Sequence, residues 1–385
     1  ATLTAAVFTL TGSMILFATV AADANLSMQQ TSSWMMNGFG WGAISSIFLS
    51  LYYKQPIFIA PSLSALLVMG PMFKVYSAPE MVAGYLLAGV IIFLLGISGI
   101  VALIGKYLPI PIIMGMIAGV FMSYGLKIVH AVESEPLVAG VTILAFLLTP
   151  RITKKIPPQA TALIVGVIMT SLFLPIEFNA EMMGRILPPL FILPQFNPTV
   201  FFSVSIPVVL LCLADTLKGY GVLSANGYDT PLNTLTSIAG LVSIVSAFGL
   251  SHGIGIAGPI TAIIGSEGAG PKQYRYAAGL LNGITILTLG ILSSILLPYL
   301  VALPTVISDV IAGLAMLGLF TNSLEMAFGS KKFKVGAFTA FIVGMSNVVI
   351  WGIGAPVWSV LFGVIVSFFI ERDDFKLRTD LQKSC

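Results

Sequence analysis

The chain has 385 residues, of which 57% are hydrophobic and 9% are charged, and its formal net charge is +3. This composition, with a mean hydropathy of +1.02, excludes a soluble protein, because too few polar side chains remain to cover a water-facing surface. It predicts an all-α polytopic membrane protein whose surroundings are a lipid bilayer.

Apolar runs separated by helix breakers predict seven membrane segments in each half of the chain. In the first half they cover residues 4–22, 35–53, 61–70, 80–104, 109–129, 136–150 and 160–175. In the second half they cover residues 201–222, 236–250, 258–266, 273–297, 304–328, 333–348 and 354–371. The third segment of each half, span 3 and span 10, is too short to cross alone, since about 20 residues are needed.

The two halves repeat each other. Gly89 and Gly96 recur with the same spacing as Gly283 and Gly290, and such glycines suit close helix contacts. An odd number of segments in each half gives the halves opposite orientations. The sequence therefore predicts 14 transmembrane segments arranged as a 7+7 inverted repeat.

The distribution of Lys and Arg tests this count, because these residues gather on the cytoplasmic side of a membrane protein. With the N-terminus inside, most of them fall in predicted cytoplasmic segments, and the predicted outer segments hold only Lys74, Lys127 and Arg185. Both termini are therefore predicted to be cytoplasmic. The first residues carry no basic segment and lead into an apolar run that the repeat requires, so no cleaved signal peptide is expected.

Proline and glycine interrupt each half at corresponding places, residues 55–62 and 252–259. Each stretch can run extended and then start a short helix, and two such helix starts facing each other form the kind of site that secondary transporters use. Their free N–H groups would bind a small substrate carrying a carboxylate or carbonyl groups. The alternative is that these residues only kink ordinary helices. The predicted substrate-binding residues are Ala60, Pro61, Ser62, Ser64, Ala257, Gly258 and Thr261.

Two acidic residues, Asp215 and Asp23, are the candidates for proton coupling. Asp215 lies well inside an apolar span, where a carboxylate is costly and indicates function. Removal from water disfavours its charged form, so the side chain can bind and release a proton. A structural ion pair with Lys218 is the alternative for Asp215, and a solvated helix end is the alternative for Asp23.

Other chemistry receives little support. His252 is predicted to face outward from a loop, or else to be a pH-sensitive neighbour of the second short helix. The sequence contains no phosphate-binding loop, no His-Glu-x-x-His motif and no nucleophile elbow. We therefore predict no enzyme activity, no cofactor, no metal and no nucleic-acid partner. An anion channel or a non-transporting scaffold on the same fold is the alternative from a different class.

Scattered residues in both halves resemble the benzoate:proton symporter family, over nearly the whole chain. They are Ser33, Trp34, Gly38, Gly40, Gly42, Ser46, 49–53, Pro56, Ala60 and Ser62, then 224–228, Phe248, Gly249, His252, 260–262 and 274–279.

The resemblance implies the inverted-repeat fold shared with nucleobase/ascorbate permeases and SulP anion transporters. It further implies a core domain of residues 1–104 and 201–297, a gate domain of residues 105–200 and 298–371, and a cytoplasmic tail of residues 372–385. A bacterial cytoplasmic (inner) membrane and a homodimer formed through the gate domain are also implied.

Two departures from the family affect the expected substrate. Pro61 stands where an aromatic residue is expected, so an aromatic ring would lose a stacking platform. Asp215-Thr216 replaces a Gln-Asn-like pair, and the acidic residue is more similar to nucleobase permeases. The resulting prediction is a proton-coupled symporter of a small organic anion, most simply an aromatic carboxylate such as benzoate, by alternating access. A nucleobase permease is the alternative.

Overall fold

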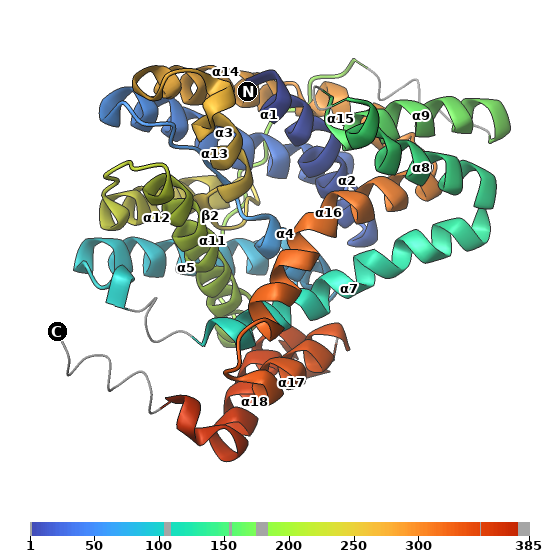
Figure 1. Ribbon diagram of the computed structural model, residues 1–385. Helices are drawn as coiled ribbons and strands as arrows, with labels where there is room; N and C mark the ends of the chain where they lie inside the picture. The colour runs from blue at the N-terminus through green and yellow to red at the C-terminus, as the bar shows by residue number, and fades with distance from the viewer. Residues whose placement is uncertain (1, 104–108, 154–155, 175–183, 347, 376–385) are drawn as a thin grey trace.

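A computed structural model describes residues 2–103, 109–153, 156–174, 184–346 and 348–375. Helices dominate the described residues, and two short pairs of antiparallel strands complete them (Figure 1). The elements of the first half are α1 (Thr2–Phe8), η1 (Thr9–Met14), α2 (Ile15–Asp23), α3 (Met28–Tyr53), β1 (Ile59–Pro61), α4 (Leu63–Met69), η2 (Gly70–Lys74), α5 (Ala78–Ser98), α7 (Ile110–Ser134), α8 (Pro136–Ile152) and α9 (Pro158–Phe173).

The second half follows a similar order. Its elements are α10 (Pro198–Val200), η3 (Phe201–Ser205), α11 (Ile206–Ala225), α12 (Leu232–Ala247), β2 (Ile254–Ile256), α13 (Gly258–Gly265), η4 (Glu267–Ala269), η5 (Lys272–Tyr274), α14 (Arg275–Ile291), α15 (Ser293–Val301), α16 (Thr305–Phe328), α17 (Lys334–Met345), β3 (Val349–Ile350), β4 (Ile353–Gly354) and α18 (Ala355–Ile370). In both halves a first helix containing a π-helical turn precedes a second helix, a short strand and a short helix.

Among the described residues, five helices are long and apolar enough to cross a membrane, and a sixth crossing results if the bent pair α14–α15 counts as one. That pair bends by 68° at Leu292, inside the single span predicted at 273–297. Beyond the bend, the Ser293 hydroxyl donates a hydrogen bond to the Ser32 carbonyl of α3. The count of fourteen segments remains a prediction.

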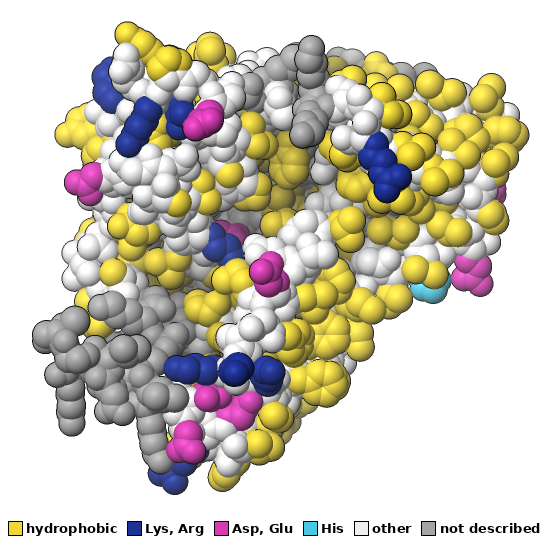
Figure 2. All heavy atoms as spheres, in the orientation of Figure 1, with side chains coloured by type: hydrophobic (Ala, Val, Ile, Leu, Met, Phe, Trp, Pro, Cys, Tyr) yellow, Lys and Arg dark blue, Asp and Glu magenta, His cyan; other side chains and the backbone are white. Residues whose placement is uncertain are grey.

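Hydrophobic side chains cover much of the outer surface on the side of α7 and α8 (Figure 2). Leu144 and Leu147 on α8 are each more than half exposed, as are Ile164 and Leu172 on α9. A continuous apolar surface of this kind is unstable in water and suits contact with lipid. The exposed face therefore agrees with the membrane location that the composition predicts.

Helices of the two halves interlock at close range. α5 packs against α12, α14 against α3, and α16 and α17 against α7. A Cβ atom placed on Gly96 of α5 would lie 2.4 Å from the backbone nitrogen of Ser237 on α12. One placed on Gly290 of α14 would lie 3.2 Å from Cβ of Phe39. The predicted close contacts at these two glycines are confirmed.

The interrupted segments cross each other at the centre of this packing. β1 pairs antiparallel with β2, with Ala60 opposite Gly255, and the short helices α4 and α13 follow directly. The prediction of an extended stretch followed by a short helix is thus confirmed in both halves. Serines of the surrounding helices satisfy the strand backbone. The hydroxyl of Ser46 accepts a hydrogen bond from the Ile59 N–H at 2.8 Å, and that of Ser243 accepts one from the Ile254 N–H at 2.9 Å.

The close contact at Gly96 leads to a stability prediction. Gly96→Ala should lower the unfolding temperature, because overpacking at a backbone contact typically costs about 1–3 kcal/mol. Gly125→Ala on α7 is the matched control, since nothing lies within 4 Å of its added Cβ and the helix gains propensity. Thermal unfolding of the detergent-purified proteins measures both. Equal unfolding temperatures for the two variants would contradict the packing at Gly96.

Candidate functional site

A cavity of about 270 Å³ opens beside the crossing of β1 and β2. Its walls come from both interrupted segments, from α11 and from α16. The face drawn in Figure 2 is hollowed near its centre, where a basic and an acidic side chain lie side by side. The predicted site residues that line the cavity are Ala60, Pro61, Ser62, Ser64, Asp215, Ala257 and Gly258.

Asp215 is tied to the first interrupted segment. The Ser62 hydroxyl donates a hydrogen bond to Asp215 Oδ2 at 2.6 Å and accepts one from the Ala65 N–H at 3.1 Å. Ser62 therefore caps α4 and holds the carboxylate at the same time. Lys218, one helical turn after Asp215, places its Nζ atom 3.9 Å from Asp215 Oδ1 and also lines the cavity. The two charges thus face the same space.

His252 is buried, and the prediction that it faces outward from a loop is wrong. The indole N–H of Trp34 donates to His252 Nδ1 at 2.8 Å, and His252 Nε2 lies 2.8 Å from the Ser62 carbonyl oxygen. Because an indole can only donate, the neutral ring carries its proton on Nε2 and donates it to Ser62. His252 thus lies against the first interrupted segment, whereas the alternative prediction placed it beside the second short helix.

Thr261 is not brought to the cavity. Its side chain is fully buried, its hydroxyl has no hydrogen-bond partner in the part of the chain that the structure describes, and it is absent from the cavity walls. The neighbouring turn of α13 presents Pro259 and Ala262 to the cavity, so the helix directs Thr261 elsewhere. Its role in substrate binding stays a prediction that this geometry does not support.

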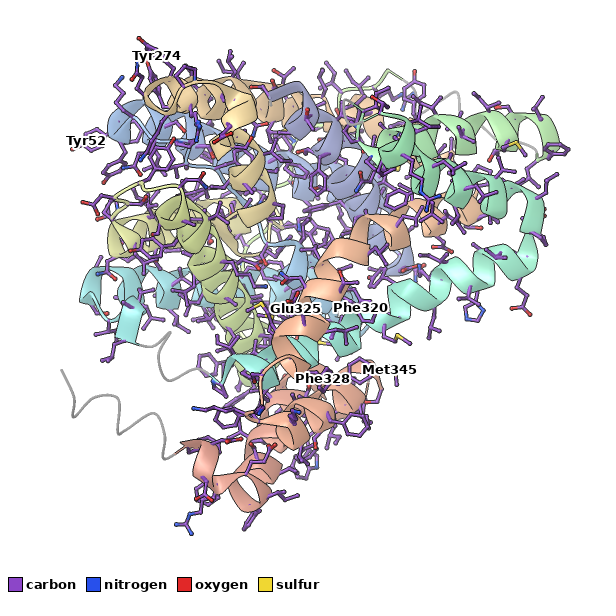
Figure 3. All side chains as sticks on the ribbon, viewed as in Figure 1. Tyr52, Tyr274, Phe320, Glu325, Phe328 and Met345 are labelled. Atoms are coloured by element: carbon purple, nitrogen blue, oxygen red, sulfur yellow. The ribbon has the colours of Figure 1, made fainter. Side chains whose placement is uncertain are left out.

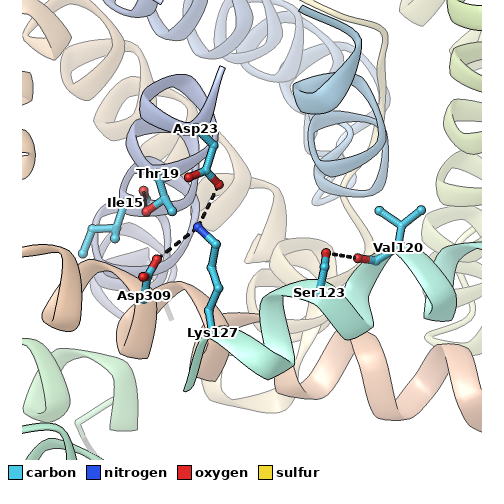
Figure 4. Close-up of polar contacts among 7 residues, drawn as sticks. All are labelled: Ile15, Thr19, Asp23, Val120, Ser123, Lys127 and Asp309. Carbon is cyan, nitrogen blue, oxygen red and sulfur yellow. Dashed lines mark hydrogen bonds and ion pairs between the residues drawn. The ribbon is translucent and has the colours of Figure 1, made fainter. Parts of the chain in front are cut away.

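Asp23 belongs to a different cluster at the end of α2 (Figure 4). Lys127 Nζ on α7 lies 2.7 Å from Asp23 Oδ2 and 3.1 Å from Asp309 Oδ1 on α16. Asp23 and Lys127 line a second cavity of about 480 Å³ between α2, α4, η2 and α7. The two predicted proton-coupling residues therefore line different cavities, with α4 reaching both.

Comparison with known proteins assigns the family. Residues 1–369 match the family model described as benzoate membrane transport protein (BenE). The chain belongs to this family. The resemblance seen in the sequence is therefore confirmed, and the protein is a membrane transport protein rather than an enzyme.

Curated relatives and a solved structure agree with this membership. The chain is 28% identical over 363 residues to the benzoate membrane transport protein of Acinetobacter baylyi, covering 94% of this chain and 92% of the relative. It is also 28% identical over 365 residues to the inner membrane protein YdcO of Escherichia coli, covering 92% of each. The transmembrane domain of a cyanobacterial bicarbonate transporter, BicA, has the same fold, with a TM-score of 0.62, 16% identity and 95% coverage of both chains.

Several residues that line the cavity are absent from the predicted site. Lys218 was considered only as a partner of Asp215, and Leu319 and Asn322 of α16 were not singled out. The amide of Asn322 within an apolar 24-residue helix was a signal that could have been read. Figure 3 shows Phe320, Glu325 and Phe328 along the same helix, close to the middle of the molecule.

The Asp23–Lys127–Asp309 cluster yields a prediction about stability. Lys127→Met should lower the free energy of unfolding by about 1 kcal/mol, because two partly exposed carboxylates lose their shared cation. Lys74→Met is the control, since Lys74 is an exposed lysine that lines the same cavity. Thermal unfolding at low and high salt measures the effect, which should shrink with salt. A Lys127→Met protein as stable as the control would argue against the cluster.

Proposed function

We propose that this chain is a proton-coupled secondary transporter of a small organic anion, with an aromatic carboxylate such as benzoate as its first candidate substrate. One observation carries the proposal. A cavity lies between two interrupted segments, and the Asp215 carboxylate on its wall is hydrogen-bonded to one of them. This is the arrangement expected of a transporter whose site sits where broken helices meet.

The start of α13 supports an anionic substrate. Ala257 supplies no side-chain cap, Pro259 has no N–H group, and Gly258 lines the cavity, so the Gly258 N–H is the donor that this helix start can offer to a ligand. The positive end of the helix dipole adds to its attraction for a carboxylate. Apolar side chains supply the rest of the wall, and they suit an aromatic body: Leu63, Val222, Ile256, Pro259, Ala262 and Leu319.

Proton coupling follows from the charge of Asp215. An anion approaching a carboxylate in a weakly polar cavity is repelled, whereas a protonated Asp215 accepts it. Uptake of the anion then brings a proton with it. A proton gradient can therefore drive substrate accumulation.

Alternating access requires a site at a boundary that moves. We propose the core domain as residues 1–104 and 201–297, and the gate domain as residues 105–200 and 298–371. The cavity lies at the boundary between these two proposed domains, because Leu319 and Asn322 belong to the gate and the other lining residues belong to the core. A change in the position of the core against the gate would open the site to each side in turn.

A cytoplasmic location of both termini, in a bacterial inner membrane, is part of the proposal. Tyr52 and Tyr274 lie at one edge of the molecule (Figure 3), as expected for aromatic residues at a membrane interface. Lys54, which follows α3 directly after Tyr53, lies over the Tyr276 ring at 4.8 Å, so a basic residue accompanies these aromatic residues. By the positive-inside rule, we propose this edge as the cytoplasmic one. A homodimer formed through the gate domain, and residues 372–385 as a cytoplasmic tail, complete the proposal.

A nucleobase permease is the second candidate, and Asp215 is the observation that favours it. A carboxylate on the cavity wall can accept hydrogen bonds from the N–H groups of a planar heterocycle. Purines and pyrimidines tested beside benzoate in a thermal-shift panel distinguish the two candidates. Stabilisation by nucleobases alone would favour the permease.

Replacement of Asp215 tests the proton-coupled mechanism. Asp215→Asn should abolish benzoate accumulation driven by a proton gradient in proteoliposomes, because an amide cannot carry the proton. Exchange of benzoate across the membrane should be partly kept. Asp229→Asn, a change of an exposed loop carboxylate, is the control and should transport as the native protein does. Full concentrative uptake by Asp215→Asn would remove Asp215 from the mechanism.

A further inference from the structure

Lys218 is the cationic group of the substrate cavity. Among the described residues that line the cavity, Asp215 and Lys218 are the only charged ones. The separation of 3.9 Å between Lys218 Nζ and Asp215 Oδ1 allows attraction but exceeds a hydrogen bond. Asp215 meanwhile accepts a short hydrogen bond from Ser62 through its other oxygen. The ammonium group is therefore a loose partner of Asp215.

The donors of Lys218 are available to a ligand. An ammonium group has three N–H donors, and among the described residues none of them makes a hydrogen bond. The side chain is 26% exposed and lies beside the start of α13, with Lys218 Cβ 4.0 Å from a Cβ placed on Gly258. A carboxylate held between Lys218 and the first N–H of α13 would find two donors from different elements.

We propose that Lys218 binds the substrate carboxylate, and that a proton on Asp215 releases Lys218 for this task. The inference rests on the proposed function and names the residue that recognises the anion. In the empty site, Lys218 has the Asp215 carboxylate as its counter-ion. In the loaded site, Asp215 carries the proton, and the substrate carboxylate takes the place of the Asp215 carboxylate as the counter-ion of Lys218.

This exchange of partners determines the net charge that crosses the membrane in each transport step. The empty pair, Lys218 with ionised Asp215, sums to zero charge. The loaded site, with Lys218, protonated Asp215 and one carboxylate, also sums to zero. Both forms can cross a weakly polar region without an unpaired charge, which is expensive there. One anion therefore accompanies one proton, and transport is electroneutral.

Few other ionisable groups face this pair. The elements α4, β2, α12, α13 and α18, which pack against α11, contain no ionisable side chain. On α11 itself the buried Cys212 thiol lies near Asp215 and Ser62. On α16, Glu325 is exposed and does not line the cavity, and on α5 the buried Tyr85 and the Asn197-bound Glu80 do not line it either. Within the described part of the chain, Asp215 and Lys218 are the only charged groups that line the cavity, and we assign the exchange to them.

The test compares a carboxylate with a neutral ligand of similar shape. Benzoate and benzamide are titrated against the purified full-length protein at acidic pH, with Lys218→Met, Lys218→Arg and the control Lys331→Met, which removes an exposed lysine between α16 and α17. Lys218→Met should weaken benzoate binding about tenfold or more, as expected for a lost charged hydrogen bond. Its benzamide affinity and unfolding temperature should stay close to those of the native protein. Lys218→Arg should keep a preference for the carboxylate.

Unchanged benzoate binding by Lys218→Met would overturn the inference, and so would a parallel loss of benzoate and benzamide binding or of stability, which would indicate a structural role. Benzoate uptake into proteoliposomes should not respond to a potassium diffusion potential imposed with valinomycin, and a potential-driven uptake would overturn the one-to-one exchange. If the native protein binds neither ligand, the proposed function itself fails, and the inference fails with it.

Discussion

The whole arrangement depends on one constraint, namely that backbone polar groups need hydrogen-bond partners wherever water is absent. The chain leaves its helices at two places in the centre of the packing, and each extended stretch solves the problem with the other. β1 and β2 exchange backbone hydrogen bonds, while serines on α3 and α12 satisfy neighbouring groups. Neither half can form this centre alone, because each supplies only one strand. The pairing of β1 with β2 therefore helps to hold the two halves of the chain together.

The same constraint determines where polar chemistry can be placed. Ser62, the residue between β1 and α4, links four groups: its N–H bonds to Gly253, its carbonyl to His252, and its hydroxyl to Ala65 and Asp215. Trp34 holds His252 in turn. Hydrogen bonds through Ser62 thus connect the Asp215 side chain directly to the place where β1 and β2 pair. Ser62 thus belongs both to the candidate site and to the structural centre, and its hydroxyl gives the Asp215 carboxylate a hydrogen-bond partner inside the packing.

The sequence allowed the centre of the fold to be predicted because its signals are local. Pro56 and Pro61 in one half, and Gly253 and Gly255 in the other, are closely spaced helix-disfavouring residues, and the corresponding position of each pair within its half reveals the repeat. The burial of His252 could not be predicted in this way, because it depends on Trp34, a residue of a distant helix. Thr261 was assigned to the cavity because it follows the break, but the rotation of α13 turns it away. Asn322 and Leu319 reach the cavity only because α16 packs beside it.

The short helix α4 lies between the two cavities. Leu63 and Ser64 at the start of α4 line the first cavity, and Leu67 and Val68 near its end line the second. A helix of 7 residues is only about 10 Å long, so a thin barrier separates the two spaces. The Asp23–Lys127–Asp309 cluster lies at the second cavity and connects α2 to α7 and α16. Within the proposed mechanism, the two carboxylate–lysine contacts then have different duties. Asp215 and Lys218 would bind the proton and the substrate carboxylate. The ion pair between Asp23 and Lys127 would join the proposed core to the proposed gate.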